Sequence, residues 1–336
     1  MNPDAVADVS RVHHGGSSDT SLLDFSANTN PERPRGVAGV YESAYAASAN
    51  YPGDDYCDYR TAAGEYLGCE PLHVVPAAGG IAALRLAFEV TLDADDEALL
   101  PAPSFGEYAR EVRLQGVDPT FVAHDDLLTT DPAGYDVVVA CNPNNPTGDA
   151  SPHDDLLAYA ERCRAAGTVL IVDEAFLDFT DQPTLAGEPG VVVVRSLTKI
   201  FGLPGLRAGL AVATGDLRER LDTARPAWGL STPAAAVGAY CLRQTTFVAE
   251  TRDRVRSERQ RMREALTPAF DIHPSEAPFL LLDVGDRDVD RVIDRARRAE
   301  IVLRDATTFR RLDSHVRVAV RRPHENDRLI DALLQA

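Results

Sequence analysis

The stretch VVVVRSLTKIFGLPGLR, residues 191–207, decides how this chain is interpreted, because it joins a short apolar run to the only lysine in the sequence. The apolar run, Val191–Val194, is typical of a buried strand. Of the 34 lysine and arginine residues, all except Lys199 are arginine. Arginine supplies charge as lysine does, but it cannot deprotonate and form a Schiff base with an aldehyde. Lys199 is therefore a candidate for covalent chemistry, with an ordinary surface residue as the plain alternative.

Short apolar runs recur on both sides of this stretch, at residues 98–100, 136–140, 169–172, 191–194 and 210–213. Helical patterns lie between them, for example at residues 79–92 and 154–165. Strands that alternate with helices predict an α/β fold with a mainly parallel sheet, covered by helices on both faces.

The C-terminal part of the chain predicts a second, smaller α+β domain. A strongly charged helical stretch, residues 245–268, leads into predicted strands at residues 279–284, 301–304 and 316–320. Residues 22–34, with Pro31 and Pro34, are typical of an extended arm. We therefore divide the chain into an N-terminal arm with part of the small domain, a large domain and a small C-terminal domain, at residues 1–40, 41–235 and 236–336.

Composition excludes several classes of protein. The net charge of −18 argues against nucleic-acid binding, which requires a basic surface. Acidic excess with scarce lysine is typical of a halophilic cytoplasm, although an arginine preference set by genome composition explains it equally well. No apolar run is long enough for a membrane span, and the first residues do not form a signal peptide, so we expect a cytoplasmic protein. The five cysteines form no C-x-x-C pair, which predicts reduced thiols and no metal site.

Asp173 directly follows the apolar run Leu170–Val172, so it and Lys199 end two successive predicted strands. Ligands in α/β folds bind at that edge of the sheet, although a helix cap is an equally common role for such an aspartate. Gly79-Gly80-Ile81 opens a predicted helix and offers N–H groups to a phosphate. Ser196 and Arg207 flank the lysine and are able to complete a phosphate site, although each alone is a common surface or cap residue.

Together these residues resemble the aspartate aminotransferase superfamily, the fold-type I pyridoxal phosphate enzymes. The resemblance covers nearly the whole chain. Three motifs in order carry it: Asn144-Asn145-Pro146-Thr147-Gly148, Asp173-Glu174-Ala175-Phe176, and Ser196-x-x-Lys199 followed by Gly205-Leu206-Arg207. It implies an aspartate aminotransferase-like fold and pyridoxal 5'-phosphate as cofactor.

The resemblance also implies roles for single residues around the cofactor ring. Lys199 would form the Schiff base and shuttle protons, and Asp173 would pair with the ring nitrogen. Asn145 would donate a hydrogen bond to the ring hydroxyl and contact the substrate. Phe105 would stack on the ring, with the region of Tyr108 as an alternative source of the stacking residue.

Further residues follow from the same resemblance. The cofactor phosphate would be held by Gly80, Ile81, Ser196 and Arg207. Tyr51 would reach the phosphate bound to the partner subunit, which implies a homodimer with shared active sites. Arg317 would bind the carboxylate of the substrate.

Two segments narrow the resemblance to threonine-phosphate decarboxylases of cobalamin synthesis. They are residues 14–16 with 23–31, and residues 317–326. Phe176 also fits that group, whereas many aminotransferases, including those for histidinol phosphate, have tyrosine there. This likeness implies that His14 and Arg304 contact the substrate phosphate.

The implied reaction is decarboxylation of L-threonine O-3-phosphate to (R)-1-amino-2-propanol phosphate. The alternative is an aminotransferase that acts on histidinol phosphate or another amino acid with 2-oxoglutarate. The same lysine, aspartate and arginine serve both reactions, so this alternative stays open.

Other enzyme classes fit the sequence poorly. Ser196-x-x-Lys199 matches the S-x-x-K motif of serine β-lactamases, but those enzymes need a second lysine, in K-T-G. A dinucleotide-binding enzyme would carry G-x-G-x-x-G after a strand, and the sequence has none. A pyridoxal phosphate domain fused to a DNA reader would need a basic module, which this acidic chain lacks.

Overall fold

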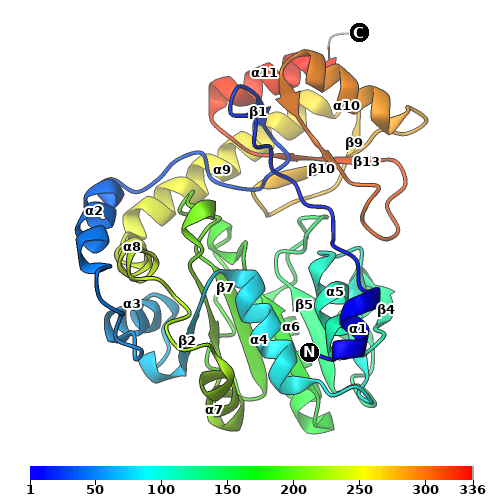
Figure 1. Cartoon of the computed structure of the whole chain (residues 1–336). Helices are drawn as coiled ribbons and strands as arrows, with labels where there is room; N and C mark the ends of the chain where they lie inside the picture. The colour runs from blue at the N-terminus through cyan, green and yellow to red at the C-terminus, as the bar shows by residue number, and fades with distance from the viewer. Residues whose placement is uncertain (335–336) are drawn as a thin grey trace.

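A seven-stranded sheet forms the centre of the molecule, with strand order β2-β8-β7-β6-β5-β3-β4 (Figure 1). The computed structural model describes residues 1–334. The strands are β2 (Val74–Ala77), β3 (Ala98–Ala102), β4 (Thr120–Ala123), β5 (Val137–Cys141), β6 (Val169–Asp173), β7 (Val191–Ser196) and β8 (Gly209–Val212). β8 runs antiparallel to both its neighbours, whereas the pairs from β7 to β4 are parallel. The prediction of a mainly parallel sheet is confirmed.

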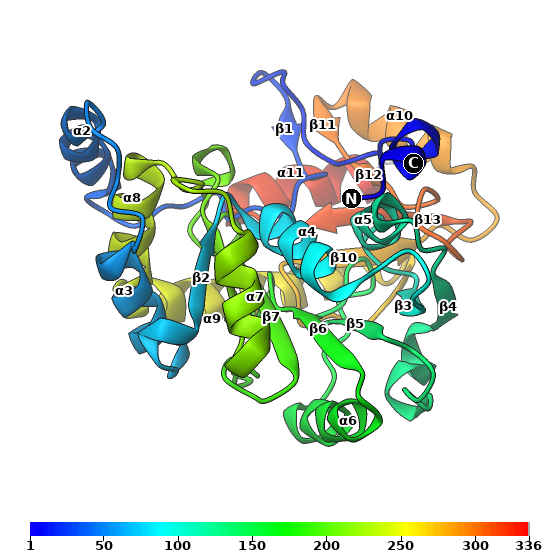
Figure 2. The same cartoon turned by 60° about the horizontal axis from the view of Figure 1, so that its bottom comes forward.

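Helices cover both faces of this sheet (Figure 2). On one face, side chains such as Val139 and Ile171 pack against α4 (Gly80–Thr91), α5 (Glu107–Gln115) and α7 (Gly215–Ala224). On the other, Val138 and Leu170 pack against α3 (Cys57–Leu67), α6 (His153–Ala166) and α8 (Thr232–Leu242). Burial on both faces explains why the strands are continuous apolar runs without polar alternation.

A smaller antiparallel sheet lies beside the first, with strand order β12-β13-β10-β9. Its strands are β9 (Asp271–Ile272), β10 (Phe279–Asp283), β12 (Arg304–Asp305) and β13 (His315–Ala319). The remaining helices are α1 (Pro3–Asp8), α2 (Val37–Ala47), α9 (Thr245–Leu266), α10 (Val289–Arg298) and α11 (Pro323–Leu334), and short 3₁₀ turns span residues 71–73, 124–129, 177–179 and 204–206. Within residues 1–334, no helix is long and apolar enough to cross a membrane.

The single strand predicted over residues 301–304 is wrong. β11 (Ile301–Val302) pairs in parallel with β1 (Leu23–Asp24), whereas β12 pairs with β13 in the four-stranded sheet. The extended segment is divided at Leu303. Residues before it pair with β1 of the N-terminal arm, and residues after it pair with β13. The N-terminal arm is thereby fastened beside the smaller sheet.

A buried group of charges ties β7 to the loop that follows β6. Arg195 donates a 3.0 Å hydrogen bond to Glu174 and a short one to Asp178, and all three side chains are buried. The Tyr66 hydroxyl also donates to Asp178, at 2.7 Å. Because both carboxylates depend on one cation, we expect Arg195→Met to lower the free energy of unfolding by about 3–5 kcal/mol.

Denaturant unfolding of purified protein measures this change, with Arg256→Met as the control. Arg256 pairs with Asp181, but both side chains are about half exposed or more, so its loss should cost less than about 1 kcal/mol. Equal losses in the two variants would contradict the assigned role of Arg195.

Candidate active site

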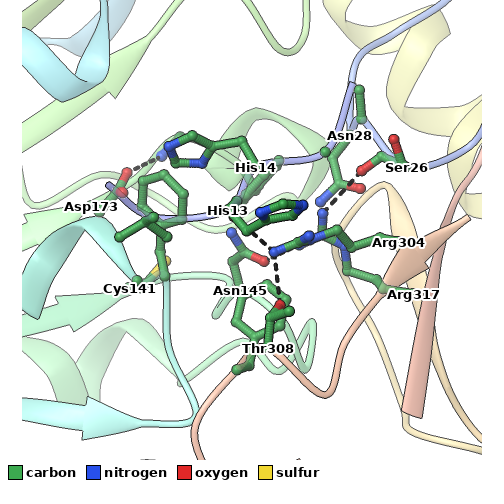
Figure 3. Close-up of a pocket in the computed structure, with 18 of the residues that line it drawn as sticks. His13, His14, Ser26, Asn28, Cys141, Asn145, Asp173, Arg304, Thr308 and Arg317 are labelled. Carbon is green, nitrogen blue, oxygen red and sulfur yellow. Dashed lines mark hydrogen bonds between the residues drawn. The ribbon is translucent and has the colours of Figure 1, made fainter. Parts of the chain in front are cut away.

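A cavity of about 240 Å³ opens between the two sheets (Figure 3). Its lining comes from strand ends of the large sheet, from the N-terminal arm and from the smaller sheet. Eight residues predicted from the sequence line it: His14, Ile81, Phe105, Asn145, Asp173, Lys199, Arg304 and Arg317. Three others, Gly80, Ser196 and Arg207, gather beside Ile81, whereas Tyr51 lies on the surface.

Asp173 and Lys199 enter the cavity from neighbouring strands. Asp173 ends β6, and Lys199 follows the end of β7. The Asp173 carboxylate is buried and accepts a 2.7 Å hydrogen bond from the Tyr108 hydroxyl. Burial raises the pKa of Asp173, and the bond from Tyr108 opposes that rise. A buried carboxylate of this kind requires a cationic partner.

The pKa of Lys199 is lowered to about 8, mainly because the ammonium group is buried and further because Arg317 carries a nearby positive charge. Its Nζ atom lies 5.7 Å from the centroid of the Phe176 ring. Roughly a tenth of the Lys199 side chains are therefore neutral amines at pH 7, and the amine is the form that attacks an aldehyde.

This pKa leads to a direct prediction for the cofactor-free protein. Because Lys199 is the only lysine, incorporation of ¹³Cε-lysine yields one NMR signal. We expect the ammonium form below pH 8 and the amine above it, so the signal should titrate with a midpoint near 8. A midpoint near 10.4, about the value of an exposed lysine, would contradict the prediction.

The loop that carries Lys199 is held by the N-terminal arm. The Asn30 backbone N–H donates to the Lys199 carbonyl at 3.1 Å, and the Asn30 side chain donates to the Ile200 carbonyl at 2.7 Å. Gly202 has a φ of +64°, and a Cβ there would lie 2.3 Å from the Glu32 carbonyl oxygen. Only glycine permits this approach between the loop and the arm.

The start of α4 and the residues around the lysine form a cradle at one end of the cavity. Gly79 has a φ of +94°, and a Cβ on it would lie 2.4 Å from the Arg207 guanidinium. A Cβ on Gly80 would lie 3.2 Å from Cβ of Ser196. Backbone N–H groups at a helix start, with an arginine and a hydroxyl beside them, are suited to bind a phosphate.

Two arginines face the cavity from the smaller sheet. Arg304 on β12 and Arg317 on β13 are directly paired in register (Figure 3). Arg304 donates to the His13 carbonyl at 2.8 Å and to the Thr308 hydroxyl at 2.9 Å. Arg317 donates a short bond to the side chain of Asn145. Burial, together with the charge of Arg304, lowers the pKa of Arg317, so the two buried cations require anionic partners.

Two residues of α5 contribute more than the sequence suggested. Tyr108, expected only as an alternative stacking residue, bonds to Asp173 and meets the Phe105 ring edge-on at 5.6 Å. Glu107 was not anticipated, and its carboxylate lies 2.8 Å from Nε2 of His14. The one available signal was the position of both residues directly after Phe105, at the start of a helix.

Tyr51 lies outside the cavity of its own chain. Its side chain is 79% exposed and stacks on Trp228, with the ring centroids 4.5 Å apart. The predicted contact with the phosphate of a partner subunit stays a prediction.

Comparison with known proteins identifies the relatives of this chain. Residues 23–333 match the family described as aminotransferase class I and II. A threonine-phosphate decarboxylase of Salmonella typhimurium is 31% identical, over 95% of this chain and 92% of that protein. Histidinol-phosphate aminotransferase 1 of Archaeoglobus fulgidus is 28% identical, over 93% and 98%. The crystal structure of histidinol-phosphate aminotransferase from Sinorhizobium meliloti, in complex with pyridoxal-5'-phosphate, has the same fold, with a TM-score of 0.81, 21% identity and coverage of 92% and 89%.

The cavity fits pyridoxal 5'-phosphate in three respects. Gly79 and Gly80 let Arg207 and Ser196 approach the bare backbone at the start of α4, which brings together the donors that a phosphate requires. The buried carboxylate of Asp173 matches a protonated ring nitrogen. The buried amine of Lys199 is able to form a Schiff base with the cofactor aldehyde. Beyond the cofactor, the buried Nε of Arg317 has no hydrogen-bond partner among the described residues, as expected for a side chain that awaits an anionic substrate.

Proposed function

This chain belongs to the family of class I and II aminotransferases, whose cofactor is pyridoxal 5'-phosphate, and from that premise we propose that it decarboxylates L-threonine O-3-phosphate. The product is (R)-1-amino-2-propanol phosphate, and the reaction serves cobalamin biosynthesis. The relatives include proteins named for this activity and proteins named for histidinol-phosphate aminotransfer, so the choice rests on the cavity.

Each part of the cavity has a task in this proposal. The bound cofactor supplies an electron sink for the pair of electrons left when a bond to the substrate Cα breaks. Lys199 would hold the cofactor through a covalent link and move a proton at Cα. Asp173, with its carboxylate oriented by Tyr108, would balance the positive charge of the ring nitrogen. Asn145 would bind the ring hydroxyl, and Phe105 would cover the ring.

The paired arginines are the observation that supports a substrate with two anionic groups, and Phe176 is the residue that favours the decarboxylase. Arg304 and Arg317 occupy opposite positions on neighbouring strands, so the cavity offers two cations side by side. L-Threonine O-3-phosphate has two anionic groups, a phosphate for Arg304 and His14 and a carboxylate for Arg317. Anchors at two points would select the bond that breaks, because they fix the orientation of the substrate about Cα. The bond from Cα to the carboxylate breaks, carbon dioxide leaves, and a proton from Lys199 takes its place.

The second candidate is aminotransfer from histidinol phosphate to 2-oxoglutarate. The 28% identical relative with that name favours it. In that reaction 2-oxoglutarate, with two carboxylates, would also satisfy both arginines. Phe176 favours the decarboxylase, because the tyrosine of many aminotransferases is replaced there.

The assembly and location belong to the same proposal: a cytoplasmic homodimer with shared sites, adapted to high salt. Tyr51 is the residue that supports the dimer, because it is exposed and lies outside the cavity of its own chain.

Product analysis separates the two reactions. The enzyme is incubated with O-phospho-L-threonine and pyridoxal 5'-phosphate, without any keto acid. Sustained release of carbon dioxide and 1-amino-2-propanol phosphate supports the decarboxylase. Failure to release carbon dioxide, with amino transfer from histidinol phosphate once 2-oxoglutarate is added, would instead establish the aminotransferase.

A further inference from the structure

The N-terminal arm crosses from the large sheet to the smaller one at the cavity. In Figure 1 it runs from α1, beside α5, up to β1. Residues 12–15 of the arm line the cavity, and they lie outside any helix or strand. Val12 packs on Gly106, and a Cβ added to Gly106 would lie 2.8 Å from a methyl group of Val12. The His13 carbonyl accepts from Arg304, so this part of the arm touches both sheets.

On the large-sheet side the arm is held by a hydrogen bond between His14 and the carboxylate of Glu107. Nε2 of His14 lies 2.8 Å from Oε1 of Glu107, a carboxylate that is only 6% exposed, whereas the His14 side chain is 44% exposed. The other oxygen of Glu107 accepts from Arg110 at 3.2 Å. Arg110 in turn pairs with Glu111 at 2.8 Å. Glu111 also accepts two 2.8 Å bonds from Arg85 on α4.

These contacts form a continuous series of polar side chains that ends at His14 on the arm: Arg85, Glu111, Arg110, Glu107 and His14. Four of its members stand on rigid helices, so the position of the Glu107 carboxylate is determined by its neighbours. His14 is the one member on irregular backbone, and it therefore takes its place from Glu107. A histidine bonded through Nε2 to a carboxylate has a fixed ring orientation, with Nδ1 left for another partner. The ring lies beside Phe105, with a centroid distance of 5.8 Å, and both residues line the cavity.

We propose that Glu107 is a positioning residue that holds the N-terminal arm over the cavity and orients His14 toward the phosphate of the substrate. The proposal rests on the proposed function, because it takes the substrate to be phosphorylated. Glu107 touches neither substrate nor cofactor and acts through His14. Its removal leaves that part of the arm held by the hydrogen bond from Arg304 to the His13 carbonyl and by the packing of Val12 on Gly106 and of His14 beside Phe105.

The test compares Glu107→Ala, Glu107→Gln and a control, Asp118→Asn, in the full-length holoenzyme. Asp118 forms an exposed pair with Arg113 near the far end of α5, so its loss leaves the contacts of His13 and His14 in place. Arg11 is exposed, and trypsin cleavage after it releases residues 1–11. Mass spectrometry follows the rate of this release with and without inorganic phosphate, and steady-state kinetics with O-phospho-L-threonine yield kcat and KM.

We expect Glu107→Ala to accelerate cleavage after Arg11 about ten- to hundredfold, the range that corresponds to loss of one hydrogen bond to a charged group. Inorganic phosphate should slow cleavage of the peptide bond after Arg11 in the wild type and not in Glu107→Ala. KM should rise by a similar factor, while kcat changes less than about threefold. Glu107→Gln keeps an acceptor for His14 and should show a smaller effect, and Asp118→Asn should match the wild type.

Unchanged cleavage and phosphate protection in Glu107→Ala would overturn the proposal. So would a fall in kcat and in thermal stability with the arm still protected, because that pattern indicates a purely structural role. If the wild type releases no carbon dioxide from O-phospho-L-threonine, the proposed function fails. The cleavage rates then decide alone whether Glu107 holds the arm.

Discussion

Lys199→Arg is expected to reduce kcat by at least about 10⁴-fold, the upper range for loss of a group that transfers protons in the reaction. Arginine keeps the charge and much of the length of the side chain, but it stays protonated at all pH values that the protein tolerates. The variant therefore lacks both the covalent link to the cofactor and the proton donor at Cα. Because the chain has no other lysine, no neighbouring amine can take over.

Absorbance of the cofactor and product analysis both report this loss. In the variant the cofactor should dialyse away and should not be fixed to the chain by borohydride. Thermal unfolding of the cofactor-free proteins is the control, and the two should unfold at similar temperatures. Residual turnover above one per cent of the wild type would show that another group does the chemistry.

Asp173→Asn is the second large effect, with an expected loss in kcat of about 10²- to 10⁴-fold. An asparagine preserves the shape of the side chain and an acceptor for the Tyr108 hydroxyl. It removes the negative charge that the ring nitrogen of the cofactor requires, and loss of one partner from a buried ion pair costs about 3–5 kcal/mol. Cofactor affinity should fall along with kcat.

Tyr108→Phe separates charge from orientation at this position. It removes the hydroxyl that orients Asp173 but leaves the carboxylate, so we expect a loss of about tenfold, in the range of one hydrogen bond to a charged group. Cofactor titration and steady-state kinetics measure both variants. If Asp173→Asn lost no more activity than Tyr108→Phe, the charge of Asp173 would not be needed.

Much of the large sheet could be predicted because its strands are buried on both faces. The runs that became β5, β6 and β7 are almost purely apolar, and their ends position Asp173 and Lys199 on adjacent strands. β2 and β4 escaped prediction, since β2 contains Pro76 and the residues of β4 are partly exposed. Local apolar pattern is a weak signal for short edge strands.

Partner choice between distant segments could not be predicted from local pattern. Residues 301–305 form one extended run in sequence, but their halves pair with strands from opposite ends of the chain. The same holds within the cavity. Glu107 resembles any acidic residue in the first turn of a helix, and only the position of His14, 93 residues away, gives it a special neighbour.

The bonds from Asn30 to the lysine loop also bear on how the protein is made. The two segments lie 170 residues apart, so the arm leaves the ribosome long before the loop exists. Contacts between such distant segments form slowly, because a long stretch of chain must be ordered to bring them together. A nascent chain that has completed β3 and β5 still lacks β7 and the loop that carries Lys199. The enzyme therefore acquires the ability to capture its cofactor only near the end of synthesis and folding, when both halves of the chain have met.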